Sequence, residues 1–164
     1  MIQDERIKVL NDRGSPEGRY VLYWMQASQR AEYNHALEFA IERANQLDQP
    51  LVAYFGITDG FPDANLRHYH FMLEGLRETR AALARRRILM TAMRGPPERV
   101  ALKAAGRASM LVCDRGYLRH QRRWREIVAR EAPCRVVQVE ERRIATVRNH
   151  AAAEGRGSIL CFVD

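Results

Sequence analysis

Short apolar runs alternate with segments of helical periodicity along most of this chain of 164 residues. A strand covered by helices on both faces is typically a continuous apolar run, and strand–helix–strand repeats form parallel sheets with right-handed crossovers. The pattern therefore predicts an α/β fold with five parallel strands. The expected strands are residues 20–25, 50–58, 88–93, 108–113 and 134–139, separated by helices at 30–47, 64–86, 98–106 and 118–131.

The two ends of the chain differ from this pattern. Residues 1–19 are polar and carry two turn signals, so we expect an extended arm that leads into the domain. The domain itself spans residues 20–140. Beyond it the alternation weakens: residues 142–153 are compatible with a helix and 158–163 with a short strand, and we regard 141–164 as a divergent C-terminal segment.

Composition limits where in the cell the protein is expected and which kinds of site it can form. Apolar residues make up 46% of the chain, and no apolar run approaches the roughly 18 to 20 residues that span a bilayer. The N-terminus mixes charges and contains no apolar signal core, so we expect a cytoplasmic protein that does not bind membranes. Three widely spaced cysteines argue against a disulfide framework, and no CxxC or histidine spacing indicates a metal site.

The formal net charge is +7, and arginine supplies nearly all of the positive charge. A basic surface can attract the phosphate backbone of nucleic acids. Here the arginines are spread over several segments rather than concentrated in one, so we do not expect DNA contact by this chain alone.

Two loops that follow apolar runs are candidate binding sites, because ligands of open α/β sheets bind at the carboxyl ends of the strands. The first loop contains Gln26, Ser28 and Arg30. These polar groups could hold a ligand or a partner domain. In the alternative interpretation, Ser28 caps the following helix while Gln26 and Arg30 are solvated.

The second loop begins at Cys113 and Asp114 and also opens a helix. Asp114 could accept hydrogen bonds from a ligand, Tyr117 could stack on an aromatic ring, and Arg119 could pair with a carboxylate or phosphate. In the alternative interpretation, Asp114 caps the turn and Gly116 permits a positive φ. In both cases we expect the two loops to lie near each other at one edge of the sheet.

Two further segments combine aromatic and charged residues. His68 and His70 fall on different faces of a helix, which does not suit a shared metal, so we expect Tyr69 and Phe71 to pack and the histidines to be partly exposed. The basic stretch at residues 119–125 could rest on a phosphate backbone. The commoner arrangement for such a helix packs its tryptophan on the sheet and leaves the arginines solvated.

Motifs for catalysis and phosphate binding are missing from the sequence. The chain contains neither a G-x-G-x-x-G nor a G-x-x-x-x-G-K-[ST] fingerprint. No Ser/His/Asp or Cys/His constellation can be assembled with any specificity, because the sequence does not fix which side chains meet. We therefore assign no catalytic residue.

Three segments together resemble a known family. VLYWMQASQRA at residues 21–31, ANLRHYHFMLEGLR at 64–77 and VCDRGYLRHQRRWR at 112–125 are similar, in order and spacing, to the N-terminal α/β domain of class II cyclobutane-pyrimidine-dimer photolyases. The similarity covers about residues 5–140. It implies a Rossmann-like, three-layer αβα domain with a five-stranded parallel sheet.

The resemblance also implies a function. In that family this domain can hold a light-harvesting antenna pigment, such as a deazaflavin, in a cleft that faces a second, helical domain. The helical domain binds FAD and the damaged DNA, and it cleaves the dimer by light-driven electron transfer. By fold position, the implied cleft is lined by strand-end residues of this chain: Met25, Gln26, Arg30, Phe55, Gly56, Cys113, Asp114 and Tyr117.

Two roles follow from this resemblance. We expect the FAD- and DNA-binding domain to be missing from this chain, and residues 141–164 to depart from the family. The chain could be an antenna-binding half that works with a helical FAD domain and has no lyase activity alone. It could instead be a stand-alone dimerising or regulatory domain without a chromophore, because the surface that the second domain covers in the family would be exposed.

Overall fold

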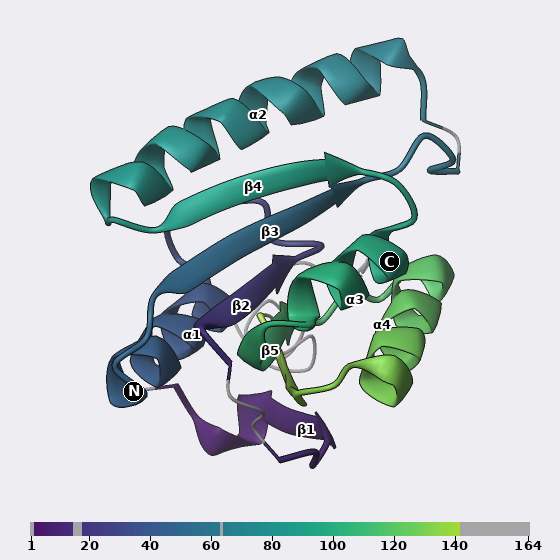
Figure 1. Cartoon of the computed structure of the whole chain (residues 1–164). Coiled ribbons are helices and arrows are strands. Elements are labelled where there is room, and N and C mark those ends of the chain that lie inside the picture. The colour runs from purple at the N-terminus through teal and green to yellow at the C-terminus, as the bar shows by residue number, and fades with distance from the viewer. Residues whose placement is uncertain (1, 15–17, 63, 142–164) are drawn as a thin grey trace, which may run out of the picture.

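A computed structural model of the chain describes residues 2–14, 18–62 and 64–141. Within these residues, a six-stranded sheet carries two helices on each face (Figure 1). The strands are β1 (Ile7–Asn11), β2 (Tyr20–Met25), β3 (Leu51–Ile57), β4 (Leu89–Arg94), β5 (Ala108–Asp114) and β6 (Arg135–Val139). The helices are α1 (His35–Gln46), α2 (Leu66–Arg85), α3 (Pro97–Ala105) and α4 (Arg119–Glu131), and a 3-10 turn at Asp4–Arg6 precedes β1.

The sheet is mixed, with strand order β1-β6-β5-β2-β3-β4. The five predicted strands are present and parallel, but β1 adds a sixth strand antiparallel to β6, so the prediction of a wholly parallel five-stranded sheet with an extended arm is wrong at the N-terminus. No side chain of β1 is fully buried, and the strand is held by backbone pairing that places Ile7 opposite Val139. A strand stabilised in this way leaves little hydrophobic signal in the sequence.

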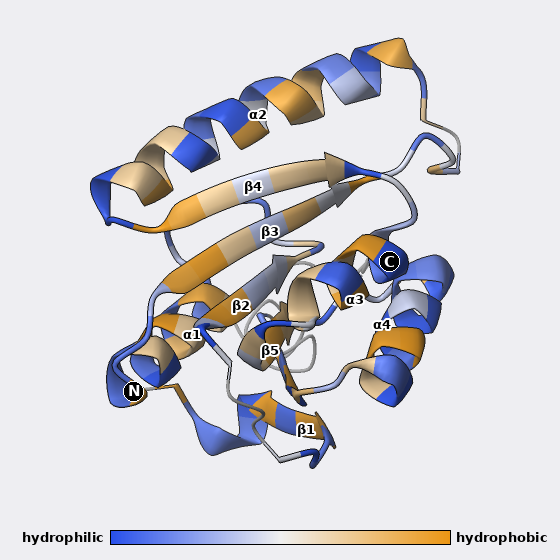
Figure 2. Ribbon diagram, in the orientation of Figure 1, coloured by the Kyte–Doolittle hydropathy of each residue, from blue (hydrophilic) through white to orange (hydrophobic). Residues whose placement is uncertain are grey.

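The central strand β2 is buried on both faces, which explains its unbroken apolar sequence. Tyr23 belongs to the apolar layer between the sheet and helices α1 and α2, whereas Trp24 belongs to the layer beneath α3 and α4. Figure 2 shows the hydrophobic residues along the central strands, and it also shows hydrophobic residues on the N-terminal half of α2.

Strand order reverses direction at β2. The chain adds β3 and β4 on one side of β2 and then returns to add β5 and β6 on the other. The carboxyl ends of β2 and β5 therefore meet at a topological switch point, where open α/β sheets bind ligands. The two loops singled out in the sequence follow these two neighbouring strands, as expected.

The first residues of two helices can be compared with the capping signals in the sequence. The helix expected from residue 30 begins at His35, and its cap is Asn34 rather than Ser28. By contrast, α3 begins with Pro97 in its first turn, where a missing N–H has no cost. The helix-compatible and strand-like segments at 142–153 and 158–163 lie outside the described residues.

Candidate functional site

A cleft of about 750 Å³ opens at the carboxyl ends of β2 and β3, between α2 and the start of α4. This size is typical of small-molecule sites, which span roughly 300–1,000 Å³. Most of the lining is apolar or aromatic. The lining residues are Trp24, Met25, Gln26, Ala27, Gln29, Phe55, Gly56, Ile57, Thr58, Phe61, Ala64, His68, Tyr69, Phe71, Met72, Gly75, Pro97, Tyr117, Leu118, Gln121 and Trp124.

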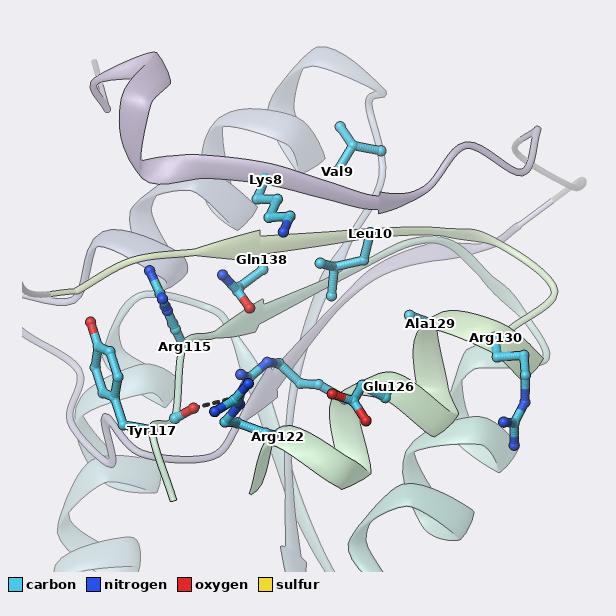
Figure 3. A pocket seen from close by; sticks show the side chains of 12 residues that line it. Lys8, Val9, Leu10, Arg115, Tyr117, Arg122, Glu126, Ala129, Arg130 and Gln138 are labelled. Atoms are coloured by element: carbon cyan, nitrogen blue, oxygen red, sulfur yellow. Dashed lines mark hydrogen bonds between the residues drawn. The ribbon is translucent and has the colours of Figure 1, made fainter. Parts of the chain in front are cut away.

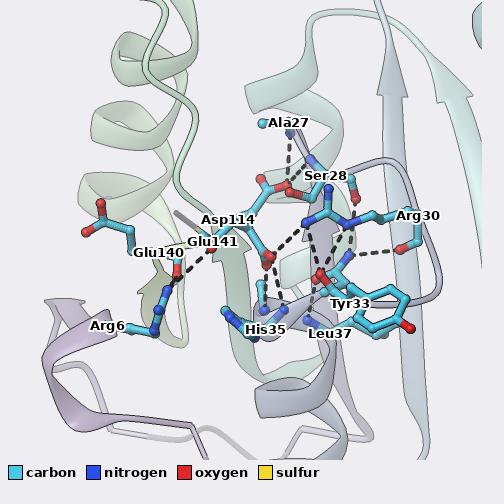
Figure 4. A network of polar contacts seen from close by, with 12 residues as sticks. Arg6, Ala27, Ser28, Arg30, Tyr33, His35, Leu37, Asp114, Glu140 and Glu141 are labelled. Atoms are coloured by element: carbon cyan, nitrogen blue, oxygen red, sulfur yellow. Dashed lines mark hydrogen bonds and ion pairs between the residues drawn. The ribbon is translucent and has the colours of Figure 1, made fainter. Parts of the chain in front are cut away.

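Asp114 fastens the two loops to each other beside this cleft (Figure 4). Its Oδ1 accepts the backbone N–H of Gln26 at 3.1 Å, and its Oδ2 accepts those of Ala27 at 2.9 Å and Ser28 at 2.6 Å. Burial raises the pKa of Asp114 to about 6, although the three N–H groups act in the opposite direction. The carboxylate therefore caps the loop after β2 and not the turn that Asp114 itself begins, so its hydrogen-bonding capacity is used within the protein.

Asn34 holds the rest of the first loop from inside. Its side chain is fully buried, and its Oδ1 accepts the N–H of Leu37 to cap α1. Its Nδ2 donates to the carbonyls of Ser28 at 3.2 Å and Arg30 at 2.9 Å. The loop carbonyls therefore have an internal partner, and α1 starts only after the loop has closed.

Glu141 completes the anchor at the N-terminus of α1. Its carboxylate accepts the N–H groups of His35 at 3.1 Å and Ala36 at 2.8 Å, and it pairs with Arg30 at 3.3 Å (Figure 4). A carboxylate is well placed at the positive end of a helix dipole. Arg30 also donates to the Tyr33 carbonyl, so its guanidinium is engaged within the loop and not in the cleft.

Gln26 combines a fixed backbone with an unpartnered side chain. The residue is only 8% exposed and lines the cleft. Among the described residues, neither Oε1 nor Nε2 of Gln26 has a hydrogen-bond partner. A buried polar group without a partner costs roughly 1–3 kcal/mol, and folded proteins leave few of them. The side-chain amide thus offers one acceptor and one donor to whatever enters the cleft.

Aromatic rings form the wall on the α4 side. The ring of His120 lies between Phe61, at a centroid distance of 4.8 Å and nearly perpendicular, and Trp124, at 4.8 Å and tilted by 57°. Both Phe61 and Trp124 line the cleft. Such a wall can stack or edge-pack against a flat aromatic ligand. Trp124 packs partly into the core and Arg119, Arg122 and Arg123 are exposed, as expected. Arg125 is the exception in this stretch, because it is buried.

The opposite wall is the N-terminal half of α2. Only Leu76, Thr79 and Leu83 of this helix are buried, and all three lie in its C-terminal half. There Thr79 donates to the Gln29 carbonyl at 3.1 Å and so joins α2 to the first loop. The N-terminal half makes the cleft wall and leaves Phe71 79% exposed, so the expectation that Phe71 packs is wrong.

Three glycines near the cleft differ in how much space a side chain would find at their positions. A Cβ at Gly56 would lie 3.0 Å from Cα of Pro97, so this glycine lets α3 start against β3. A Cβ at Gly116 would lie 2.3 Å from Oε1 of Gln121; Gly116 is not at a positive φ, so close packing explains it instead. A Cβ at Gly75, in the middle of α2, would meet no atom within 4 Å.

Five of the eight predicted site residues line the cleft: Met25, Gln26, Phe55, Gly56 and Tyr117. The other three, Arg30, Cys113 and Asp114, do not. Cys113 is completely buried in the core beneath α3 and α4, and burial raises the pKa of its thiol to about 12. The Tyr117 hydroxyl donates to Glu140 at 2.6 Å, and desolvation followed by this contact raises its pKa to about 12.

The sequence analysis missed the contribution of α2 to the cleft. His68, Tyr69, Met72 and Gly75 line it, although the sequence indicated only a helix that packs. The available signal was Gly75, because a glycine in the middle of a 20-residue helix is unfavourable unless something requires a bare backbone there.

Within residues 2–14, 18–62 and 64–141, no group of three or more His, Cys, Asp or Glu side chains could hold a metal ion. In the same ranges no helix is both long and apolar enough to cross a membrane.

Comparison with known proteins identifies the family. The model of the DNA photolyase family matches residues 21–161, so the chain belongs to the DNA photolyase family. This match continues past residue 140, into the segment that the sequence analysis regards as divergent.

Curated relatives agree with this assignment. The chain is 46% identical over 155 residues to the deoxyribodipyrimidine photo-lyase of Methanothermobacter thermautotrophicus, covering 94% of this chain and 35% of that protein. It is 34% identical over 113 residues to the enzyme of the same name from Arabidopsis thaliana, covering 67% of this chain and 23% of that protein. It is 33% identical over 178 residues to the enzyme of that name from Oryza sativa subsp. japonica, covering 97% of this chain and 34% of that protein. The chain thus spans about a third or less of the length of these relatives.

Solved structures show where the fold recurs. The chain is similar to a putative universal stress protein from Pseudomonas aeruginosa, with a TM-score of 0.54, 15% identity and coverage of 75% of this chain and 48% of that one. It is also similar to a universal stress protein from Archaeoglobus fulgidus, with a TM-score of 0.51, 15% identity and coverage of 73% of this chain and 98% of that one. At such identities the likeness concerns the fold alone.

Proposed function

We propose that this chain is the antenna-binding half of a class II photolyase that repairs DNA in the light. In this proposal the cleft at the ends of β2 and β3 holds a flat light-harvesting pigment of the deazaflavin type. The observation that carries the proposal is the buried, unpartnered amide of Gln26 in a cleft whose other walls are aromatic and aliphatic.

The chemistry of such a pigment complements this arrangement. A deazaflavin has a pyrimidinedione edge on which C=O and N–H groups alternate, and a side-chain amide can accept from one and donate to the other. Its fused rings are flat and apolar, which suits stacking or edge contacts with Phe61, Trp124 and Tyr69. The rigid anchoring of the Gln26 backbone by Asp114 fixes the position of the amide before the pigment binds.

The catalytic flavin belongs elsewhere in this proposal. The relatives are about three times as long as this chain or longer, and we propose that a helical domain corresponding to the remainder binds FAD and the damaged DNA. Cleavage of the pyrimidine dimer then takes place in that domain, and this chain has no lyase activity alone. The exposed Leu66, Phe71 and Leu73 on α2 are the surface that such a domain could cover.

The same surface supports a second candidate function. Leu66 is 85% exposed and Phe71 79%, and exposed apolar residues that cluster on one helix are typical of an interaction surface. Two copies of this chain could bury α2 against each other, which would make the chain a dimerising or regulatory domain. The cleft favours the first function, because dimerisation does not explain the unpartnered amide of Gln26.

The decisive experiment is a fluorescence titration of a deazaflavin with the purified chain. We expect saturable quenching or a spectral shift at micromolar pigment. Gln26→Leu preserves size but removes both polar atoms, so we expect at least about a tenfold loss of affinity, the equivalent of 1.4 kcal/mol. The same variant removes an unpaired buried amide, and its pigment-free form should be more stable by about 1 kcal/mol.

The matched control is Gln46→Leu, because Gln46 is exposed on α1 and does not line the cleft. This control should bind pigment like the wild type. An absence of any spectral change, or equal affinity in the Gln26 and Gln46 variants, would contradict the proposal.

A further inference from the structure

A second cleft, of about 700 Å³, lies between β1 and α4 (Figure 3). It shares only Tyr117 with the first cleft. Its cationic lining comes from three parts of the fold: Lys8 on β1, Arg115 on the loop after β5, and Arg122, Arg125 and Arg130 on α4. The antenna proposal does not use these cations.

Arg125 is the buried member of this group. The residue is only 7% exposed, although it lines the cleft. Its Nη1 donates to the carbonyls of Gly116 at 2.8 Å and Gln121 at 3.5 Å. No further hydrogen bond of its guanidinium is formed with the described residues. A buried arginine normally has a carboxylate or phosphate partner, because an isolated buried charge is costly.

Burial, and not the neighbouring charges, is the main cost for the charged guanidinium of Arg125. Burial has the largest effect and lowers the pKa of Arg125, and the positive charges of Arg115 and Arg122 lower it further. Cys113 and Asp114 act in the opposite direction. Asp114 acts on Arg125 only through its charge, because the bonds of the guanidinium among the described residues go to the carbonyls of Gly116 and Gln121.

Only some of the surrounding cations have a carboxylate partner. Arg115 pairs with Glu140 at 2.8 Å and Arg130 with Glu131 at 2.9 Å, whereas Lys8 and Arg122 form no ion pair with the described residues. Glu126 is the one carboxylate among the lining residues, and it too forms no ion pair with the described residues. Positive charge is therefore in excess around a concave site with a buried guanidinium.

We propose that this cleft binds the phosphate group of a small phosphorylated molecule. Guanidinium groups recognise phosphate by paired, charge-assisted hydrogen bonds, and phosphate would supply the partner that Arg125 lacks. A small molecule fits better than a nucleic-acid backbone, because Arg125 is only 7% exposed. Only a group that enters the cleft can reach so buried a side chain. The inference is independent of pigment binding in the first cleft.

Isothermal titration of the full chain with inorganic pyrophosphate, at constant ionic strength, tests the proposal. We expect saturable one-site binding in the wild type. Arg122→Ala and Lys8→Ala should each weaken binding by about fivefold or more, since each removes one charge-assisted contact. Both positions are exposed, so these variants should fold even if Arg125→Met does not.

Arg123→Ala is the matched control, because Arg123 is an exposed arginine next to Arg122 that does not line the cleft. It should change the affinity by less than about twofold. Equal losses in the Arg122 and Arg123 variants would reveal general attraction by net charge and would overturn the proposal. No binding of pyrophosphate, or binding of duplex DNA that pyrophosphate fails to displace, would overturn it as well.

Discussion

Asp114 shows how one buried residue can organise a candidate site without lining its cleft. Its carboxylate gathers three consecutive backbone N–H groups from a neighbouring strand end, and this fixes the direction in which the Gln26 side chain leaves the backbone. The chemical capacity of Asp114 is used within the protein. At this scale the polar residues that look most reactive in the sequence hold the loop, and the neutral amide of Gln26 is the group left without a hydrogen-bond partner at the cleft.

The pKa of Asp114 leads to a prediction about pH. Its pKa rises from 3.8 to about 6 on folding, so between about pH 4 and pH 6 the folded protein holds a proton that the unfolded chain has released. The contribution of Asp114 is therefore fully present below about pH 4 and is lost as pH rises through 6, by at most about 3 kcal/mol. Urea unfolding of wild type and Asp114→Asn at several pH values measures the effect as a difference. An equal pH dependence in both proteins would contradict it.

At the scale of elements, α2 is divided into two halves with different functions. The C-terminal half is fixed to the sheet through Leu76 and Leu83 and to the first loop through Thr79. The N-terminal half stands as one wall of the cleft, and its Leu66 is exposed, uncovered by any residue that the structure describes. Figure 1 shows α2 along β4, at the edge of the sheet. An element placed in this way can form a cleft that a helix packed along its whole length would close.

Gly75 gives the prediction for this element. In Gly75→Ala the new Cβ meets no atom within 4 Å, so the helix should gain about 1 kcal/mol of stability from reduced chain entropy. In Gly75→Trp the indole would occupy the cleft, and pigment affinity should fall by more than about tenfold. Glu78→Trp, on an exposed α2 position outside the cleft, is the control and should bind normally. Pigment binding that is unchanged in Gly75→Trp would place the pigment elsewhere.

At the scale of the whole molecule, the described domain presents apolar surface that its own residues do not cover. The chain spans about a third or less of its curated relatives, and the exposed residues of α2 lie beside the proposed pigment cleft. A pigment at that boundary would be close both to this domain and to whatever covers α2.

We predict that the isolated chain associates with itself through α2. Burial of Leu66, Phe71 and Leu73 between two copies removes apolar surface from water, so sedimentation should show a reversible, concentration-dependent dimer. The double variant Leu66→Glu and Phe71→Glu should be monomeric with an unchanged unfolding midpoint, because both side chains are exposed in the monomer. A wild-type chain that remains monomeric at high concentration would argue against the second candidate function.

Sequence patterns and tertiary contacts determined different parts of this protein. Periodicity located the five parallel strands and the helices between them, because burial on both faces or on one face sets the spacing of apolar residues. The three segments at 21–31, 64–77 and 112–125 carried the resemblance to photolyases, and the family match supports it. These features are local, so a single sequence contains them.

Only the tertiary structure decided which polar groups are free. The sequence could not separate a ligand-binding Asp114 from a capping one, because the deciding partners are backbone N–H groups 86 to 88 residues away. For the same reason it missed β1, which is held by pairing with β6, and the buried guanidinium of Arg125. Whether a polar group is satisfied depends on contacts between distant segments, and those contacts exist only once the chain has folded.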